Sequence, residues 1–210
     1  MGMTTFEEYV HAFGFGVGTG IELETESEGD ISALDNESEI YSATATFGQG
    51  ITVTPLQIVM AYAAIANGGV LKAPLIVDEI RHPDGSVEKR MSVDVAQVID
   101  SKTARTLAAM LVSVVEYGHG KRAGVPGYYI GGKTGTAQVA KSDGIGYAQD
   151  NTIGSFAGFG PVEDPKFAMI VSIDNPKDVV WAESTAAPLF GEIAEFLLQY
   201  FEVPPVRMVE

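Results

Sequence analysis

Three short runs near the C-terminus place the strongest constraint on the fold of this 210-residue chain. Residues 128–139, 153–160 and 167–174 each have the length and composition of a β-strand. The gaps between them hold turn residues, such as Glu163-Asp164-Pro165, and are too short for the crossover that parallel neighbours require. The sequence therefore predicts an antiparallel sheet built from these three strands.

Helical periodicity predicts the elements that cover this sheet. A helix over residues 54–67 has the clearest start, because Thr54 can cap it, Pro55 suits its first turn and Gln57 completes a capping box. Further helices are predicted over 6–13, 101–117 and 188–201. The apolar residues expected to face the interior are Leu107, Met110, Leu111, Val114 and Val115 of the third helix, and Leu189, Ile193, Phe196, Leu197 and Phe201 of the last. The expected fold is α/β of the α+β type, an antiparallel sheet covered by helices 54–67, 101–117 and 188–201.

Two segments are expected to lie outside this core. Residues 14–39 contain glycines and the acidic run IELETESEGD, so they predict a surface segment without a packed core of its own. Residues 74–91 alternate around Pro83-Asp84-Gly85, which is typical of a β-hairpin turn.

Composition excludes several classes of function. A formal net charge of -15 argues against binding to nucleic acid or to an anionic membrane surface, because both need excess Lys and Arg. The absence of cysteine excludes disulfides and thiolate metal sites. The longest apolar run, residues 58–66, is about half of a bilayer span, and residues 1–16 lack the pattern of a secretory signal, so the sequence predicts a soluble chain.

The segment YYIGGKTGTAQV, residues 128–139, fits two motifs. With Gly127 it matches the phosphate-binding loop Gly-x-x-x-x-Gly-Lys-Thr, but such a loop must open a helix, and the residues after Thr134 alternate like a strand. Lys-Thr-Gly is also one of the motifs of the serine acyl-transfer enzymes that penicillin attacks. A strand suits that second motif, since Lys133 can offer a fixed charge and the hydroxyls hydrogen bonds to a substrate carboxylate.

The surrounding sequence favours the second motif. The segments FGQGITVTPLQIVMAYAAIANGG, GHGKRA, GYYIGGKTGTAQ and SFAGFGPVEDPKFAMIVSIDNP occur in this order. Together they resemble the transpeptidase domain of class B penicillin-binding proteins, the peptidoglycan D,D-transpeptidases. The resemblance extends over about residues 6–201 and implies a penicillin-binding transpeptidase, or β-lactamase-like, fold.

Two further motifs of that family have no convincing match. The nucleophile motif Ser-x-x-Lys occurs only at Ser86 to Lys89, inside the predicted hairpin, where no helix or oxyanion donor would support it. A Ser-x-Asn motif does not occur in the sequence. Both motifs precede the matched region in the family, so residues 1–210 are expected to be the C-terminal portion of an incomplete domain. Without the family's first strands, the strand 167–174 would keep an unpaired, apolar edge.

The resemblance implies roles for individual residues. Lys133, Thr134 and Thr136 would bind the terminal carboxylate of a stem peptide or a β-lactam. Gly135 would allow its close approach, and the backbone N–H of Thr136 would be one of two oxyanion donors. Gln138, at the far end of the strand, is a further candidate for substrate binding.

Other polar and aromatic residues are expected to be structural. His11, His82 and His119 lack metal-binding spacing and are expected at the surface, so no metal site is predicted. The carboxylates of residues 22–39 are expected to form a solvated face. Trp181 is expected in the core or at the rim of the cleft.

Two functional hypotheses follow. In the first, the chain is part of a cell-wall D,D-transpeptidase that acts outside the cytoplasm, on stem peptides and with other cell-wall synthesis proteins. Its membrane contact would come only through an absent N-terminal anchor, and it would need no cofactor. The chain alone would be inactive. In the second, it is a non-catalytic binding or scaffold protein that keeps the carboxylate pocket.

Overall fold

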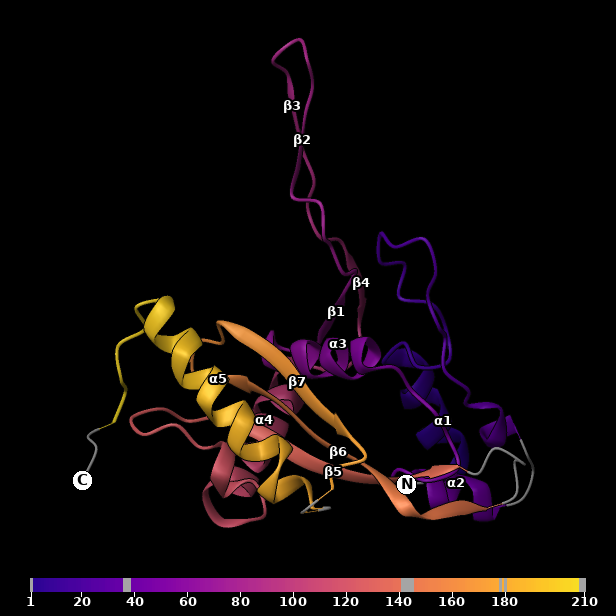
Figure 1. The fold of residues 1–210 in the computed structure, drawn as a ribbon. Coiled ribbons are helices and arrows are strands. Elements are labelled where there is room, and N and C mark those ends of the chain that lie inside the picture. The colour runs from indigo at the N-terminus through magenta and orange to yellow at the C-terminus, as the bar shows by residue number, and fades with distance from the viewer. Residues whose placement is uncertain (1, 36–38, 141–145, 178, 180, 208–210) are drawn as a thin grey trace.

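The structure is a computed structural model that describes residues 2–35, 39–140, 146–177, 179 and 181–207. Its α-helices are α1 (Met3–Ala12), α2 (Glu39–Ala45), α3 (Pro55–Ala66), α4 (Ser101–Tyr117) and α5 (Ala186–Tyr200). The strands are β1 (Val70–Lys72), β2 (Glu79–Arg81), β3 (Val87–Lys89), β4 (Asp94–Gln97), β5 (Gly131–Ala140), β6 (Tyr147–Gly160) and β7 (Phe167–Asp174). Short 3-10 helices are η1 (Ser32–Asp35), η2 (Lys121–Ala123) and η3 (Ala182–Ser184). Figure 1 shows their arrangement.

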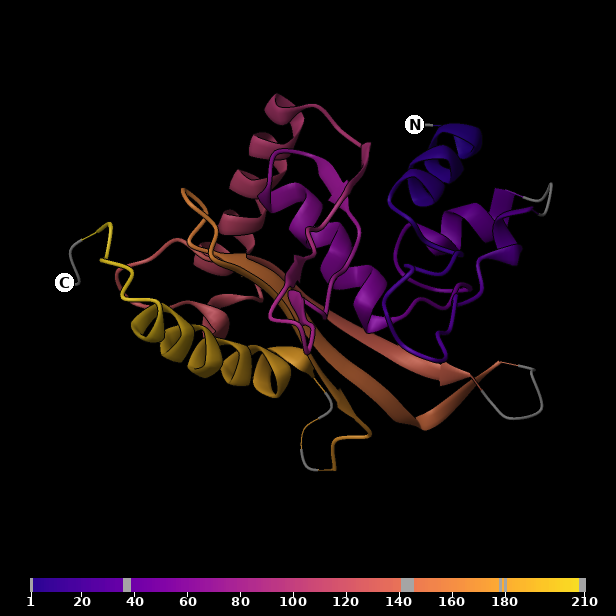
Figure 2. The ribbon, with the colours of Figure 1, turned by 90° about the horizontal axis from the view of Figure 1, so that it is seen from above.

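The predicted antiparallel sheet is confirmed. Its order is β5-β6-β7, with Lys133 opposite Ala157 and Phe156 opposite Val171. Helices α3 and α4 lie on one face and α5 on the other, as Figure 2 shows. Both β5 and β7 are edge strands within the part of the chain that the structure describes, which agrees with the open edge expected for residues 167–174.

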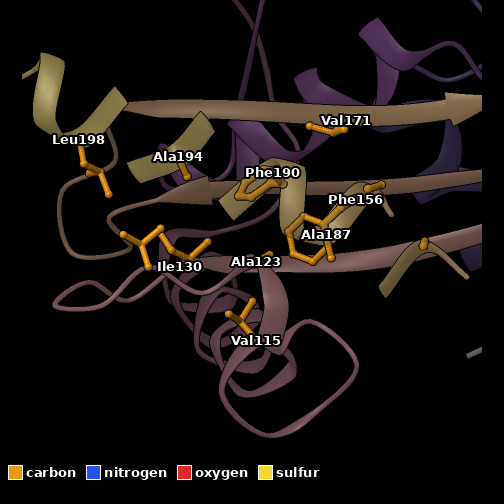
Figure 3. Close-up of a cluster of buried hydrophobic side chains, with 12 residues drawn as sticks. Val115, Ala123, Ile130, Phe156, Val171, Ala187, Phe190, Ala194 and Leu198 are labelled. Atoms are coloured by element: carbon orange, nitrogen blue, oxygen red, sulfur yellow. The ribbon is translucent and has the colours of Figure 1, made fainter. Parts of the chain in front are cut away.

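The main core lies between the sheet and α5 (Figure 3). The rings of Phe156 and Phe190 are both fully buried, and their centres are 4.6 Å apart. Around them pack Val115, Ala123, Val125, Ile130, Val171, Ala182, Ala186, Ala187, Ala194 and Leu198. This cluster holds α5 to the strand that carries Phe156.

The predicted buried stripe of the last helix is wrong in part. Leu189, Phe196 and Phe201 are 41%, 62% and 47% exposed. The buried side of α5 instead holds Ala186, Ala187, Phe190, Gly191, Ala194 and Leu198. A methyl group at Gly191 would lie 2.9 Å from the carbonyl oxygen of Arg122 in η2, so this side needs small residues. The prediction followed the large apolar residues, whereas close packing selects the small ones.

The stripe predicted for residues 101–117 needs a smaller correction. Met110 is 60% exposed, and the buried residues of α4 are Ala104, Ala108 and Val115. Asp100 caps this helix by accepting hydrogen bonds from the N–H groups of Lys102 and Thr103. The capping box of α3 agrees with the prediction, and it involves both Thr54 and Gln57.

The N-terminal residues form a small lobe with its own apolar cluster. Ile31 and Leu34 are 8% and 3% exposed and pack with Ala45 of α2, a helix that the sequence did not predict. Phe6, Val10, Phe15 and Ile51 pack around them. The expectation that residues 14–39 form only a surface segment is therefore wrong for Ile31 and Leu34, while residues 36–38 lie outside the described residues.

Gln57 joins this lobe to α3. Its side chain is 1% exposed, and its amide nitrogen donates to the carbonyl oxygens of Val17 and Glu28, both at 2.9 Å. A second link is the pair of hydrogen bonds between the backbones of Asp30 and Thr52, each 2.8 Å long. One buried amide thus fixes the path of a loop that has little regular structure.

The predicted hairpin is confirmed and projects from the body of the molecule (Figure 1). Gly85 has a φ of 84° at its turn. Beneath it, β1 pairs with β4. The carboxylate of Glu22 accepts hydrogen bonds from the N–H of Val77 at 3.0 Å and from Arg90 at 2.9 Å, and these contacts lower the pKa of Glu22. The N-terminal lobe therefore supports one side of the hairpin.

The C-terminal tail packs against the segment that leads into β5. Arg207 forms a bidentate ion pair with Glu116 of α4, with N–O distances of 2.8 and 3.0 Å, and its guanidinium lies 4.5 Å from the ring centre of Tyr129. The bonds to Glu116 raise the pKa of Arg207. The Tyr128 hydroxyl donates to the carbonyl of Val203 at 2.7 Å. The start of β5 is thereby fixed in place.

No helix in the described part of the chain combines the length and apolar character needed to cross a membrane.

Candidate active site

A groove of about 840 Å³ runs along the open edge of β5. Residues 133–136 of that strand form its floor. One wall comes from residues 46–48, which follow α2, and the other from His119 and residues 181–183. The groove thus combines four segments that are far apart in the sequence.

The strand direction determines which groups face the groove. Alternation places Thr134 and Thr136 on the α5 side of the sheet, opposite Phe156 and Gly154, whereas Lys133 and Gly135 share the other side. The Thr134 carbonyl accepts a hydrogen bond from Lys133 Nζ at 3.0 Å, so it points away from β6. Because such directions repeat at every second residue of an antiparallel strand, the N–H of Thr136 points to the same open edge.

Lys133 is exposed and lies in a strand, not at the start of a helix. The phosphate-loop interpretation is therefore excluded, as the alternation had predicted. Beside it, a methyl group at Gly135 would lie 2.7 Å from the hydroxyl oxygen of Ser155, which itself donates to the Gly135 carbonyl at 3.4 Å. Because the Lys133 side chain is exposed, its charge is available at the edge of the sheet.

The wall formed by η3 is held close to the sheet. The Ala182 N–H donates to the hydroxyl oxygen of Thr136 at 3.4 Å, and the Thr185 hydroxyl donates to the Trp181 carbonyl at 3.0 Å. A methyl group at Gly154 would lie 3.2 Å from the Thr185 hydroxyl oxygen and 3.4 Å from Ala182 Cα. Glycine at that position lets η3 approach β6 and so places its side chains over the floor of the groove.

His119 and Glu183 form a contact across this wall. His119 Nδ1 lies 2.6 Å from Glu183 Oε2, although the two residues are 64 positions apart in the sequence. Their side chains are 84% and 43% exposed. His119 is at the surface, as expected, but it also lines the groove, which its sequence context did not indicate.

The structure brings together most, but not all, of the predicted site residues. Lys133, Thr134, Gly135 and Thr136 line one groove, and Trp181, 62% exposed, lies at its rim. Gln138 is exposed further along β5, beyond the residues that line the groove, and its substrate role stays a prediction.

The groove is also lined by residues that were not predicted as site residues, among them Thr46, Phe47, Gly48 and Glu183. Phe47 and Gly48 begin the segment FGQGITVTPLQIVMAYAAIANGG, which served only to indicate the family. That signal does not show which strand the segment approaches.

Ser86 and Lys89 lie away from this groove, on the hairpin. The Ser86 hydroxyl donates to the carboxylate of Asp84 at 2.7 Å, and this bond lowers the pKa of Asp84. A serine that donates to a turn aspartate, with its lysine on an exposed strand, lacks the helix that the nucleophile motif needs. In the described residues, no group of three or more His, Asp or Glu is placed to hold a metal ion.

Comparison with known proteins shows the family to which the chain belongs. Residues 1–195 match the family of the penicillin binding protein transpeptidase domain. The chain is 40% identical to stage V sporulation protein D of Bacillus subtilis over 98% of its own length and 32% of that protein. It is 34% identical to the peptidoglycan D,D-transpeptidase FtsI of Escherichia coli over 80% of its length and 27% of that protein.

Solved structures show the same fold. The apo crystal structure of penicillin binding protein 3 from Mycobacterium tuberculosis superposes with a TM-score of 0.87 at 35% identity, covering 97% of this chain and 48% of the other. Structures of the same protein with aztreonam and with ampicillin match equally well, with TM-scores of 0.86 and 0.87. The chain therefore spans about half of these solved relatives and about a third of the curated ones, and it belongs to the transpeptidase domain family of class B penicillin-binding proteins, the peptidoglycan D,D-transpeptidases.

Proposed function

We propose that this chain supplies the Lys-Thr-Gly wall of a D,D-transpeptidase active site and binds the carboxylate end of a peptidoglycan stem peptide or of a β-lactam. One observation carries the proposal: Lys133, Thr134, Gly135 and Thr136 lie along the open edge of β5, and this edge forms the floor of a groove. An extended peptide can pair with such an edge and place its terminal carboxylate beside the lysine.

Each residue then has a chemical role. The Lys133 ammonium, which reaches the open edge where it contacts the Thr134 carbonyl, and the hydroxyls of Thr134 and Thr136 bind the carboxylate by charge-assisted hydrogen bonds. Gly135 leaves room beside the strand. The N–H of Thr136, which points to the open edge, donates to the oxyanion that forms when a serine adds to the peptide carbonyl. Gln138 would contact the substrate further along the strand.

We place the serine nucleophile outside residues 1–210. The chain spans 48% of the M. tuberculosis protein, and its one Ser-x-x-Lys match lies in a hairpin turn. The chain would thus be the C-terminal portion of the domain and inactive alone. In the longer protein, the serine oxygen forms an ester with the donor peptide as the terminal residue leaves as an amine. An amine of a second peptide then takes the acyl group and releases the serine.

The setting of the longer protein follows from its relatives. It would act outside the cytoplasm with other cell-wall synthesis proteins, attach to the membrane through a segment outside these residues, and use no cofactor. β-Lactam binding is supported by the aztreonam and ampicillin complexes of the M. tuberculosis protein.

The carboxylate site can be tested on this chain by NMR titration with a peptide that ends in D-Ala-D-Ala. Lys133→Ala should weaken binding about tenfold or more, because a hydrogen bond to a charged group contributes roughly 1.5–3 kcal/mol. Lys89→Ala, on the exposed hairpin strand, is the matched control and should bind like the wild type. The C-terminal amide of the peptide should bind weakly to every variant. Equal weakening of acid and amide by Lys133→Ala would refute the carboxylate role.

The second test addresses inactivity of the chain alone. Incubation with a fluorescent penicillin should give no covalent adduct by mass spectrometry. A stoichiometric adduct on Ser86 would overturn the assignment of the nucleophile to another part of the protein. A longer protein that also failed to form an adduct would favour the alternative, a non-catalytic binding or scaffold protein that keeps the carboxylate pocket.

A further inference from the structure

The groove holds a carboxylate that the proposed roles do not use. Glu183 lies in η3 at the level of Thr136, since the N–H of the preceding residue, Ala182, contacts the Thr136 hydroxyl oxygen at 3.4 Å. Its Oε2 atom contacts His119 Nδ1 at 2.6 Å. Among the described residues, the structure records no other hydrogen bond or ion pair for Glu183, so its second oxygen, Oε1, can accept from a ligand.

His119 fixes the direction of this carboxylate. It lies between the end of α4 and η2, and its contact with Glu183 ties the α4 end of the wall to η3. A glutamate held at one oxygen loses less conformational freedom when the other oxygen binds a ligand. His119 therefore acts as a positioning residue for Glu183.

Two exposed aromatic side chains line the same groove. Trp181 is 62% exposed and Phe47 is 69% exposed, one on each wall. An aromatic face attracts a cation, and a carboxylate next to it adds a charge-assisted hydrogen bond. A glutamate in a groove that two aromatic side chains also line is thus suited to a primary ammonium group.

We infer that Glu183, positioned by His119, binds the ammonium group of an amine-bearing peptide in the groove that Lys133, Trp181 and Phe47 also line. The inference rests on the proposed function, because it assumes that a peptide carboxylate lies at Lys133. The groove then recognises both charges of its ligand. Lys133 takes the carboxylate, and Glu183 takes a side-chain amine of the same peptide.

Two peptides distinguish the amine contact at Glu183 from the carboxylate contact at Lys133. The first is Nα-acetyl-lysyl-D-alanyl-D-alanine, which carries a free amine and a free carboxylate, and the second is the same peptide with its side-chain amine acetylated. For the wild-type chain, NMR titration should give a Kd roughly fivefold lower for the free amine, as expected for a partly exposed ion pair. The difference should shrink at high salt, which screens exposed charges.

Variants test whether the difference in Kd between the two peptides depends on Glu183. Glu183→Gln should abolish it and leave binding of the acetylated peptide unchanged. Glu192→Gln, an equal change of charge on the exposed side of α5, should keep it. The inference is overturned if the wild type binds both peptides equally, or if the difference survives in Glu183→Gln, and in both cases the carboxylate site stands. Failure of both peptides to bind overturns the carboxylate site and the amine site together.

Discussion

Replacing Gln57 with methionine, a residue of similar volume, should destabilise the N-terminal lobe. The wild-type amide donates to the carbonyls of Val17 and Glu28 at 2.9 Å each, and its oxygen accepts from the N–H of Thr54 at 2.9 Å. Methionine fills a similar space but makes none of these bonds, so cavity formation adds little. At about 1 kcal/mol for each bond, the loss is about 3 kcal/mol.

Urea denaturation measures this loss as a lower midpoint with an unchanged slope. Gln199→Met, at an exposed position of α5, is the matched control and should stay within about 0.5 kcal/mol of the wild type. Hydrogen exchange adds a local readout, because the N–H groups of Asp30 and Thr52 bond to each other's carbonyls across the loop. They should exchange faster in Gln57→Met, whereas amides of β6 should not.

A loss below about 0.5 kcal/mol, with unchanged exchange at Asp30 and Thr52, would refute the assigned role of Gln57. The consequence for function is separate. Residues 46–48 belong to this lobe and form one wall of the groove, so a loosened lobe should also weaken peptide binding.

Three further predictions concern packing and pH. Phe190→Ala should cost about 3–5 kcal/mol in thermal or urea denaturation, because the ring is fully buried, whereas Phe196→Ala, at a side chain 62% exposed, should change stability by less than about 0.5 kcal/mol. Gly132→Ala should cost about 1–3 kcal/mol, since its methyl group would lie 2.5 Å from a buried phenylalanine ring of β6, and a wild-type melting temperature would contradict this. The Val77 amide resonance should titrate with the lowered pKa of Glu22, so their hydrogen bond is complete above the usual glutamate pKa of 4.5 and is lost as the pH falls through the lowered value. A midpoint at or above 4.5 would contradict it.

Local sequence patterns predicted the elements whose structure is determined by residues close together in the sequence. The capping box at Thr54, the turn at Gly85 and the antiparallel order of the last three strands depend on side chains a few positions apart or on short connections. The start of α3 is therefore correct to within a residue, and the hairpin turns where it was predicted, although its strands β2 and β3 are shorter than residues 74–91 suggested.

Packing between distant elements could not be predicted in this way. Helix α5 is apolar on two sides, and periodicity does not show which of them meets the sheet. The choice depends on η2, whose Arg122 carbonyl lies so close that Gly191 has no room for a side chain. Likewise, Leu34 is buried only because α2 folds over it, and that seven-residue helix has no distinctive signal.

The candidate site likewise has a part that local sequence predicts and a part that depends on packing between distant elements. The motif at Lys133 could be recognised because its four residues are consecutive on one strand. Phe47, His119 and Glu183 could not, because the segments that carry them meet only after α2, η2 and η3 have packed against that strand. A recognised motif thus predicted the floor of the groove, while its walls needed the tertiary structure.

The charge of the chain bears on which ligand this groove can hold. With a formal net charge of -15, the molecule repels an approaching anion mainly within about 10 Å of its surface, because 0.1 M salt screens the charge at longer distances. At the proposed site, a bare carboxylate would therefore have to be captured at short range, by Lys133 and by the N–H that points to the open edge of β5. A peptide with an amine as well as a carboxylate would avoid that repulsion and would find a partner for each charge, at Glu183 and at Lys133. The groove and the surface charge together thus favour a zwitterionic peptide over a simple anion.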